Sequence, residues 1–119
     1  MQPTTRAFLQ LIEIWQSEHT PLKPSVSPGK LQTLFATHGF RATQDLIDLY
    51  SLTGGMEYGC ANERMFELWC LDRLNEENSP SKWDFLWFGD WLICSHLYAL
   101  QPVDDRHSAV YNVLAGIRA

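Results

Sequence analysis

The sequence predicts an α+β domain in which N-terminal helices pack on one face of a four- to five-stranded, mainly antiparallel sheet. Helical periodicity is confined to the first half of the chain, strand-like segments follow Gly55, and short connections join those segments. Strands that follow one another through short connections pair antiparallel. The apolar sides of the helices need a sheet face to cover, which predicts two packed layers.

Three N-terminal segments have apolar residues at helical spacing. The first, residues 5–18, has them at Phe8, Leu9, Leu11, Ile12 and Trp15. Ser27-Pro28 is typical of a helix start and predicts a second helix that ends near Gly39. Thr43 opens a third helix over residues 44–52, and Gly54-Gly55 end it.

The most apolar stretch, Phe85–Ile93, is interrupted only by the turn-type pair Gly89-Asp90. We interpret it as a buried strand, a tight turn at this pair, and a second strand that continues through Leu100. Residues 56–58, 65–71 and 109–114 are further predicted strands, and residues 72–78 a short helical turn. Within 65–71, Phe66, Leu68 and Cys70 alternate with Glu67 and Trp69.

Length and composition indicate one globular domain over residues 1–119. A chain of 119 residues with 45% apolar and 19% charged residues can bury a core without disulfides. No apolar run reaches the ~18 residues that a membrane span needs. Residues 1–6 do not resemble a secretion signal, so we expect a cytoplasmic protein. Three cysteines without CxxC spacing indicate neither a disulfide framework nor a zinc site.

The net charge of -5 arises entirely in the second half of the chain. Residues 54–119 hold ten acids and five bases, whereas acids and bases cancel in residues 1–53. An acidic surface repels phosphate backbones, which excludes nucleic acid as a partner class. It attracts a basic protein, although on charge alone an acidic surface kept for solubility is the better explanation.

The residues that could carry catalysis are few. His96 and Cys94 are two apart on a predicted strand, so their side chains point the same way but lie ~7 Å apart, too far for a nucleophile–base pair. Gly54-Gly55 lacks the lysine and following helix of a phosphate loop. We therefore expect no enzyme, no cofactor and no metal, and keep a small enzyme that uses Cys94 or His96 as an alternative.

Five tryptophans are more than packing requires. Trp87 is expected in the core, whereas Trp83 and Trp91 flank the central strand and are candidate interface anchors, because Trp is enriched at binding hot spots. The alternative is that both complete the core.

Three segments within residues 40–114 carry the motifs of one known family. Residues 46–55 (LIDLYSLTGG) join a helix to a glycine pair, and residues 66–77 (FELWCLDRLNEE) join a strand to a short acidic helix. Residues 86–100, followed by Val110-Tyr111, form a hairpin and a further strand. Together they resemble the Smi1/Knr4 superfamily, also called SUKH. The family usually continues into a C-terminal helix, which this chain would lack.

The resemblance implies an interaction module with no catalytic residue set to transfer. Bacterial members are mostly immunity proteins that bind and neutralise a toxin, often a nuclease or deaminase, and fungal members act as scaffolds. We therefore expect an immunity protein whose acidic surface binds a basic toxin domain, with a scaffold or regulatory adaptor as the alternative. From charge and turn placement, the expected partner-binding residues are Glu57, Glu76, Glu77, Trp83, Asp90, Trp91, Asp104 and Asp105.

Overall fold

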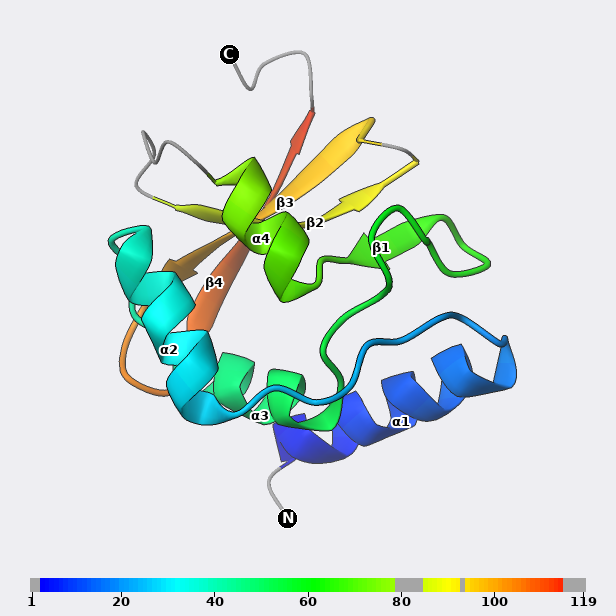
Figure 1. Cartoon of the computed structure of the whole chain (residues 1–119), viewed down its shortest axis with the longest axis horizontal. Coiled ribbons are helices and arrows are strands. Elements are labelled where there is room, and N and C mark those ends of the chain that lie inside the picture. The colour runs from blue at the N-terminus through cyan, green and yellow to red at the C-terminus, as the bar shows by residue number, and fades with distance from the viewer. Residues whose placement is uncertain (1–2, 79–84, 93, 115–119) are drawn as a thin grey trace.

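The computed structural model describes residues 3–78, 85–92 and 94–114 (Figure 1). The helices are α1 (Pro3–Ser17), α2 (Pro28–Thr37), α3 (Gln44–Leu52) and α4 (Leu71–Glu77). The strands are β1 (Phe66–Leu68), β2 (Leu86–Trp91), β3 (His96–Pro102) and β4 (Ser108–Leu114). The predicted fold class is confirmed: helices pack on a four-stranded sheet whose strands all pair antiparallel in the order β1-β2-β3-β4.

The predicted turn at Gly89-Asp90 is wrong, because both residues lie inside β2. Asp90 is the cross-strand partner of Glu67 in β1, and the chain reverses only between Trp91 and His96, where β3 begins. Gly89 is needed for close packing: a Cβ there would lie 2.8 Å from the carbonyl oxygen of Glu67. A glycine inside a strand and a glycine in a turn look the same in sequence.

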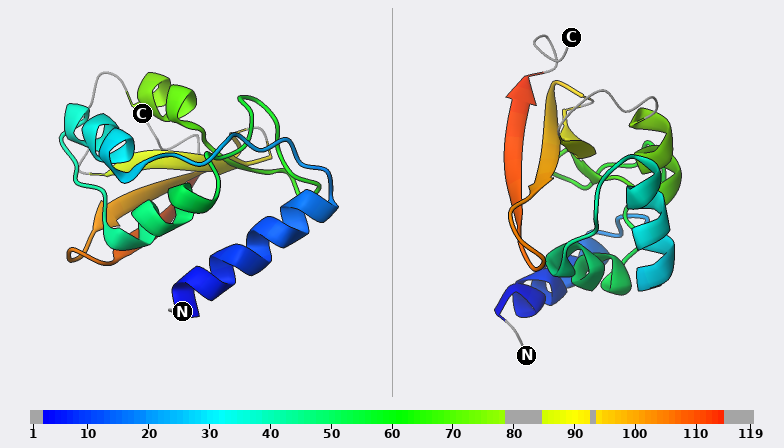
Figure 2. Two further views of the ribbon diagram at one scale, coloured as in Figure 1. Left: turned by 60° about the horizontal axis from the view of Figure 1, so that its bottom comes forward. Right: turned by 90° about the vertical axis from the view of Figure 1, so that its left-hand side faces the viewer.

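Helices cover both faces of the sheet (Figure 2). On one face, Trp15 of α1 stacks on Phe66 of β1 with ring centroids 6.1 Å apart. On the other face, α4 buries Leu74 completely, and Asn78 at its end bonds the backbone of Trp87 in β2. The predicted helical turn is thus a helix on this second face, and α2 lies beside it (Figure 2), with the His38 ring at the end of α2 bonded to the Asn75 side chain of α4 at 3.1 Å.

The N-terminal helices begin and end close to their predicted positions. Ser27 caps α2 by accepting a hydrogen bond from the Lys30 N–H at 3.3 Å, as expected for this residue before Pro28. Thr43 precedes α3 as predicted, but its buried hydroxyl bonds Asp45 and Ser108 rather than the helix backbone. This contact ties the start of α3 to the start of β4.

The segment between α3 and β1 is held against the core without forming the predicted strand. Of residues 56–58, only Met56 pairs, with Leu22 and with Trp69. Gly55 has a φ of 90°, and a Cβ on it would lie 2.8 Å from the carbonyl oxygen of Trp69. Tyr50 on α3 donates to the same oxygen at 2.6 Å, and burial raises the pKa of its hydroxyl. The glycine therefore allows the loop to lie against the end of β1.

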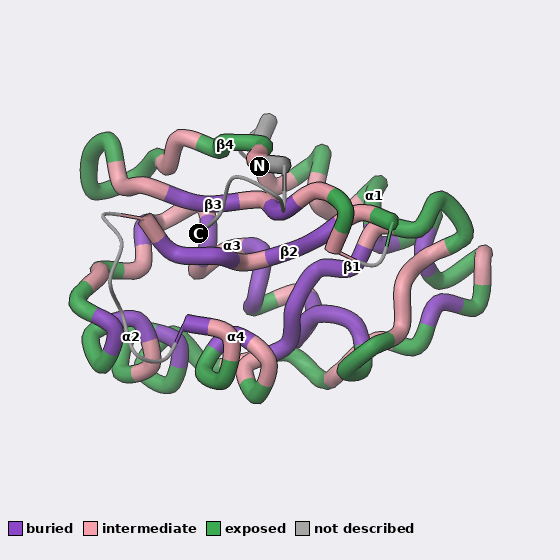
Figure 3. Tube along the Cα trace, turned by 90° about the horizontal axis from the view of Figure 1, so that it is seen from above, coloured by how far each residue is buried: buried purple, intermediate pink, exposed green. Residues whose placement is uncertain are grey.

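Burial is deepest in β2 and β3 and in the helix faces that contact them (Figure 3). The largest fully buried side chains include Trp69, Trp87, Tyr50 and Phe35. The core also buries two acidic residues, Glu67 and Asp90, each only 3% exposed.

Candidate binding surface above a buried ion cluster

Glu67 and Asp90 place two carboxylates side by side beneath α4. The residues are cross-strand partners in β1 and β2, and such partners have Cβ atoms ~5 Å apart on the same face. Both side chains are 4% exposed. Two buried like charges at this separation repel each other strongly, so the fold requires a cation between them.

Arg73, in the first turn of α4, supplies this cation. Its Nη1 atom lies 2.7 Å from Oε1 of Glu67 and 3.4 Å from Oδ2 of Asp90, and its side chain is 12% exposed. The guanidinium carbon lies 4.7 Å from the ring centre of Trp69 and 5.1 Å from that of Tyr58. Burial opposes the charge of Arg73, but its hydrogen bond to Glu67 and the two carboxylates outweigh this and raise its pKa.

The remaining carboxylate contacts fix two loops. The backbone N–H of Gly59 donates to Oε2 of Glu67 at 3.1 Å, and the N–H of Cys94 donates to Oδ1 of Asp90 at 3.2 Å. The indole N–H of Trp69 donates to Oδ2 of Asp90 at 2.6 Å. The cluster thus holds the loop before β1 and the turn after β2 from below, which gives it a clear structural role.

Tyr58 lies between the buried ion cluster and solvent. Its ring is 45% exposed and covers Arg73, while Glu57 beside it and Glu76 on α4 are also exposed. Partial desolvation, the charge and hydrogen bond of Glu76, and the charge of Glu77 raise the pKa of the Tyr58 hydroxyl. We call Glu57, Tyr58, Glu76 and Glu77 the Tyr58 face. It combines an exposed aromatic side chain, the carboxylates of Glu76 and Glu77 beside it, and the carboxylate of Glu57, its neighbour in the chain.

Comparison of the chain with protein-family models, curated proteins and solved structures finds no match. The resemblance to the Smi1/Knr4 superfamily accordingly stays a prediction from the sequence.

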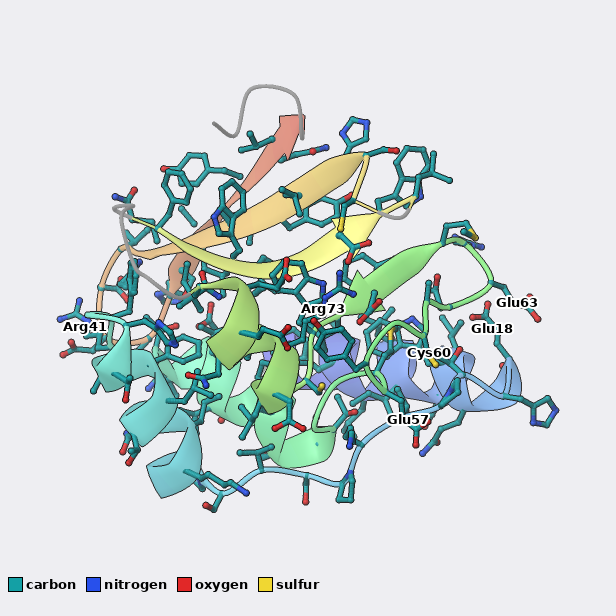
Figure 4. The ribbon with its side chains drawn as sticks, turned by 45° about the horizontal axis from the view of Figure 1, so that its top comes forward. Glu18, Arg41, Glu57, Cys60, Glu63 and Arg73 are labelled. Carbon is teal, nitrogen blue, oxygen red and sulfur yellow. The ribbon has the colours of Figure 1, made fainter. Side chains whose placement is uncertain are left out.

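The structure separates the predicted partner-binding residues into different places. Glu57, Glu76 and Glu77 belong to the Tyr58 face. Asp104 and Asp105 lie in the β3–β4 turn, where Asp105 pairs with Arg41 at 3.3 Å; Figure 4 shows Arg41 on the opposite side of the molecule from Glu57. Hydrogen bonds from the backbone N–H groups of Arg106 and His107 and from the His107 ring lower the pKa of Asp104.

Two further predicted residues take different roles, and one is not described. Asp90 as a surface contact is a wrong prediction, because the residue lies in β2 and its carboxylate is used inside the ion cluster. Trp91 is partly exposed, and its indole N–H donates to the carbonyl oxygen of Arg64 at 2.9 Å, so it holds the loop before β1. Trp83 lies outside the described residues.

Cys94 and His96 do not form a catalytic pair. Cys94 lies in the turn after β2 with a φ of 66°, so it is not on a strand face with His96. Its Sγ accepts from Arg73 Nη2 at 3.5 Å, whereas the His96 ring contacts the Asn112 side chain at 3.0 Å. Burial and the charge of Asp90 raise the pKa of the Cys94 thiol, which makes it a weaker nucleophile at neutral pH.

Two negative findings apply to residues 3–78, 85–92 and 94–114. Among these residues, no three histidine, cysteine or acidic side chains come close enough together to hold a metal ion. None of their helices has the length and apolar character to cross a membrane.

The sequence analysis missed Glu67, Arg73 and Tyr58. Alternation places Glu67 and Trp69 on the side of their strand opposite Phe66 and Leu68, and α4 buries that side as well. One signal was present: an acid at the centre of a long apolar run, as Asp90 is, needs a buried partner. Identifying Arg73 as that partner requires knowing where α4 packs.

Proposed function

We propose that this chain is a non-enzymatic protein-binding module that binds a basic partner through the Tyr58 face. Within this proposal it acts as an immunity protein, neutralising a basic toxin domain of nuclease or deaminase type by direct binding. The observation that carries the proposal is an exposed tyrosine beside the carboxylates of Glu76 and Glu77, on a loop that the buried cluster fixes.

Three physical features support binding by this face. Tyrosine is enriched at interface hot spots, because its ring gives a large contact area for few rotatable bonds. Carboxylates around it steer and orient a basic partner. The hydrogen bond from Gly59 to the buried Glu67 limits the conformations of the loop, so less entropy is lost on binding.

The chemistry around Cys94 supports binding in preference to catalysis. An activated thiol requires a lowered pKa and a neighbouring base, and Cys94 has a raised pKa and an arginine as its side-chain neighbour. The Nη1 atom of Arg73 is paired with Glu67 and Asp90, so the charge of the guanidinium is compensated inside the protein.

The test is co-expression with the toxin encoded beside the gene, followed by measurement of cell survival and complex formation. Charge reversal on the Tyr58 face, Glu76→Lys with Glu77→Lys, should abolish protection and weaken the complex at least ~100-fold. The matched control, Asp104→Lys with Asp105→Lys, changes the net charge equally at the other end of the molecule and should keep both.

If Asp104→Lys with Asp105→Lys abolished protection and Glu76→Lys with Glu77→Lys kept it, the partner would bind at the β3–β4 turn. That result would overturn the proposed binding by the Tyr58 face. Absence of both protection and complex with the unmodified chain would favour the scaffold or adaptor alternative. A gene neighbourhood that encodes no toxin would point the same way.

A further inference from the structure

Strand β4 forms the outer edge of the sheet. Among the described residues, β3 is its only strand neighbour, and the register runs from Pro102 opposite Ser108 to His96 opposite Leu114. Val110 is 58% and Tyr111 47% exposed on this edge. An edge strand presents backbone donors and acceptors that can pair with another strand.

The hydrogen-bond pattern identifies which groups point outward. The turn closes with the Val103 N–H donating to the His107 carbonyl at 3.0 Å. Because bonded and non-bonded pairs alternate in an antiparallel ladder, Ala109, Tyr111 and Val113 bond to β3. Ser108, Val110, Asn112 and Leu114 therefore direct their backbone N–H and C=O groups away from β3.

Among the described residues, a side chain bonds the backbone N–H of the first of these outward positions. The Ser108 N–H, which this pattern directs outward, donates to Oδ2 of Asp45 on α3 at 3.0 Å. Natural edge strands are usually protected by charges, proline, a bulge or a covering segment. The sequence of β4, SAVYNVL, holds no charge and no proline, and its register with β3 has no bulge.

The geometry points to a second copy of this chain as the occupant of this edge, paired antiparallel through β4 about a two-fold axis at Asn112. This register places Val110 opposite Leu114 and Tyr111 opposite Val113, so apolar residues meet apolar residues and asparagine meets asparagine. In this register the outward backbone N–H and C=O groups of Val110, Asn112 and Leu114 in each copy all form hydrogen bonds with the other copy, about six in total.

Charge favours a second copy over a basic partner at this edge. A basic segment would find no carboxylate on β4, whereas self-pairing puts no like charges opposite each other. The acidic residues Glu57, Glu76 and Glu77 lie in the segment before β1 and on α4, not on β4, and would stay free in the dimer. The two copies would form one continuous eight-stranded sheet with an isologous interface.

The first test measures mass against concentration by analytical ultracentrifugation of the full chain. We expect a reversible monomer–dimer equilibrium that Val110→Lys weakens at least ~10-fold, because it places a charge on the edge. The control is Val103→Lys, an identical change at a 66% exposed residue of the β3–β4 turn, which should leave the equilibrium unchanged. A dimer that both variants weaken equally, or neither weakens, overturns the proposal.

The second test uses the unmodified protein and therefore does not depend on a variant folding. Amide hydrogen exchange at Val110 and Asn112 should slow as protein concentration rises, because these N–H groups become bonded in the dimer. The Ser108 amide, already bonded to Asp45, should exchange at a constant rate. Concentration-independent exchange at Val110 and Asn112, or a monomer at every concentration, overturns the proposal.

Discussion

Replacing Arg73 by methionine tests whether the guanidinium is what allows two carboxylates to lie under α4. Methionine keeps an unbranched side chain against Trp69 and Tyr58 but removes the charge that lies 2.7 Å from Glu67 and 3.4 Å from Asp90. Removing one partner of a buried ion pair costs about 3–5 kcal/mol, because the remaining charges lose their compensation. Urea unfolding followed by circular dichroism at pH 7 should show a loss of this size.

The pH dependence of the variant gives an independent check. Without Arg73, the folded state favours a protonated carboxylate at Glu67 or Asp90 more than the unfolded state does. The folded state then binds more protons, so the stability of the variant should rise as the pH falls from 7 towards 5. Each unit by which the folded-state pKa exceeds the unfolded value adds about 1.4 kcal/mol of this recovery.

Two further variants complete the experiment. Glu67→Gln added to Arg73→Met removes one of the opposed carboxylates and should restore part of the stability at pH 7. Arg41→Met is the control, because Arg41 pairs with Asp105 where the side chains are 57% and 90% exposed, and such pairs contribute less than about 1 kcal/mol. The proposed role of the cluster would be refuted if Arg73→Met lost no more stability than Arg41→Met and its stability did not rise as the pH falls from 7 towards 5.

Two other predictions follow from backbone geometry and from the thiol. Gly55→Ala should lower the free energy of unfolding by at least about 2 kcal/mol, because φ is 90° and the new Cβ would lie 2.8 Å from the Trp69 oxygen. Gly39→Ala, at a φ of 81° with open space around it, should cost only about 1 kcal/mol; equal losses in urea unfolding would contradict this. Cys94 should react slowly with iodoacetamide at pH 7, because its pKa is raised above the usual 9.0. The protonated thiol is favoured by folding, so its contribution to stability is complete below pH 9.0 and is lost as the pH rises through the folded-state pKa. The free energy of unfolding, measured from pH 8 to 11, should therefore fall more steeply with pH in the unmodified protein than in Cys94→Ala. Parallel curves for the two proteins would contradict the raised pKa of Cys94.

Local sequence patterns determined most of the secondary structure of this protein. Ser27-Pro28 marks the start of α2 by its own capping chemistry, and α3 also begins at the predicted position, although the Thr43 hydroxyl bonds Asp45 and Ser108 there. The antiparallel pairing of β2, β3 and β4 follows from the short connections between them, which leave no room for a crossover. The connection from β1 to β2, residues 69–85, includes α4 and is long enough for a crossover, so its length does not decide how these two strands pair.

The tertiary structure alone decided which acids face solvent and which lie inside. Asp90 looks like part of a surface turn, and Glu67 looks like the polar side of a strand, until α4 packs on that face and brings Arg73 between them. It also separated Glu57, Glu76 and Glu77 from Asp104 and Asp105, although all five belong to the same acidic half of the sequence. Burial and pairing of a charge depend on neighbours that are distant along the chain, and their positions are fixed only when the helices pack on the sheet.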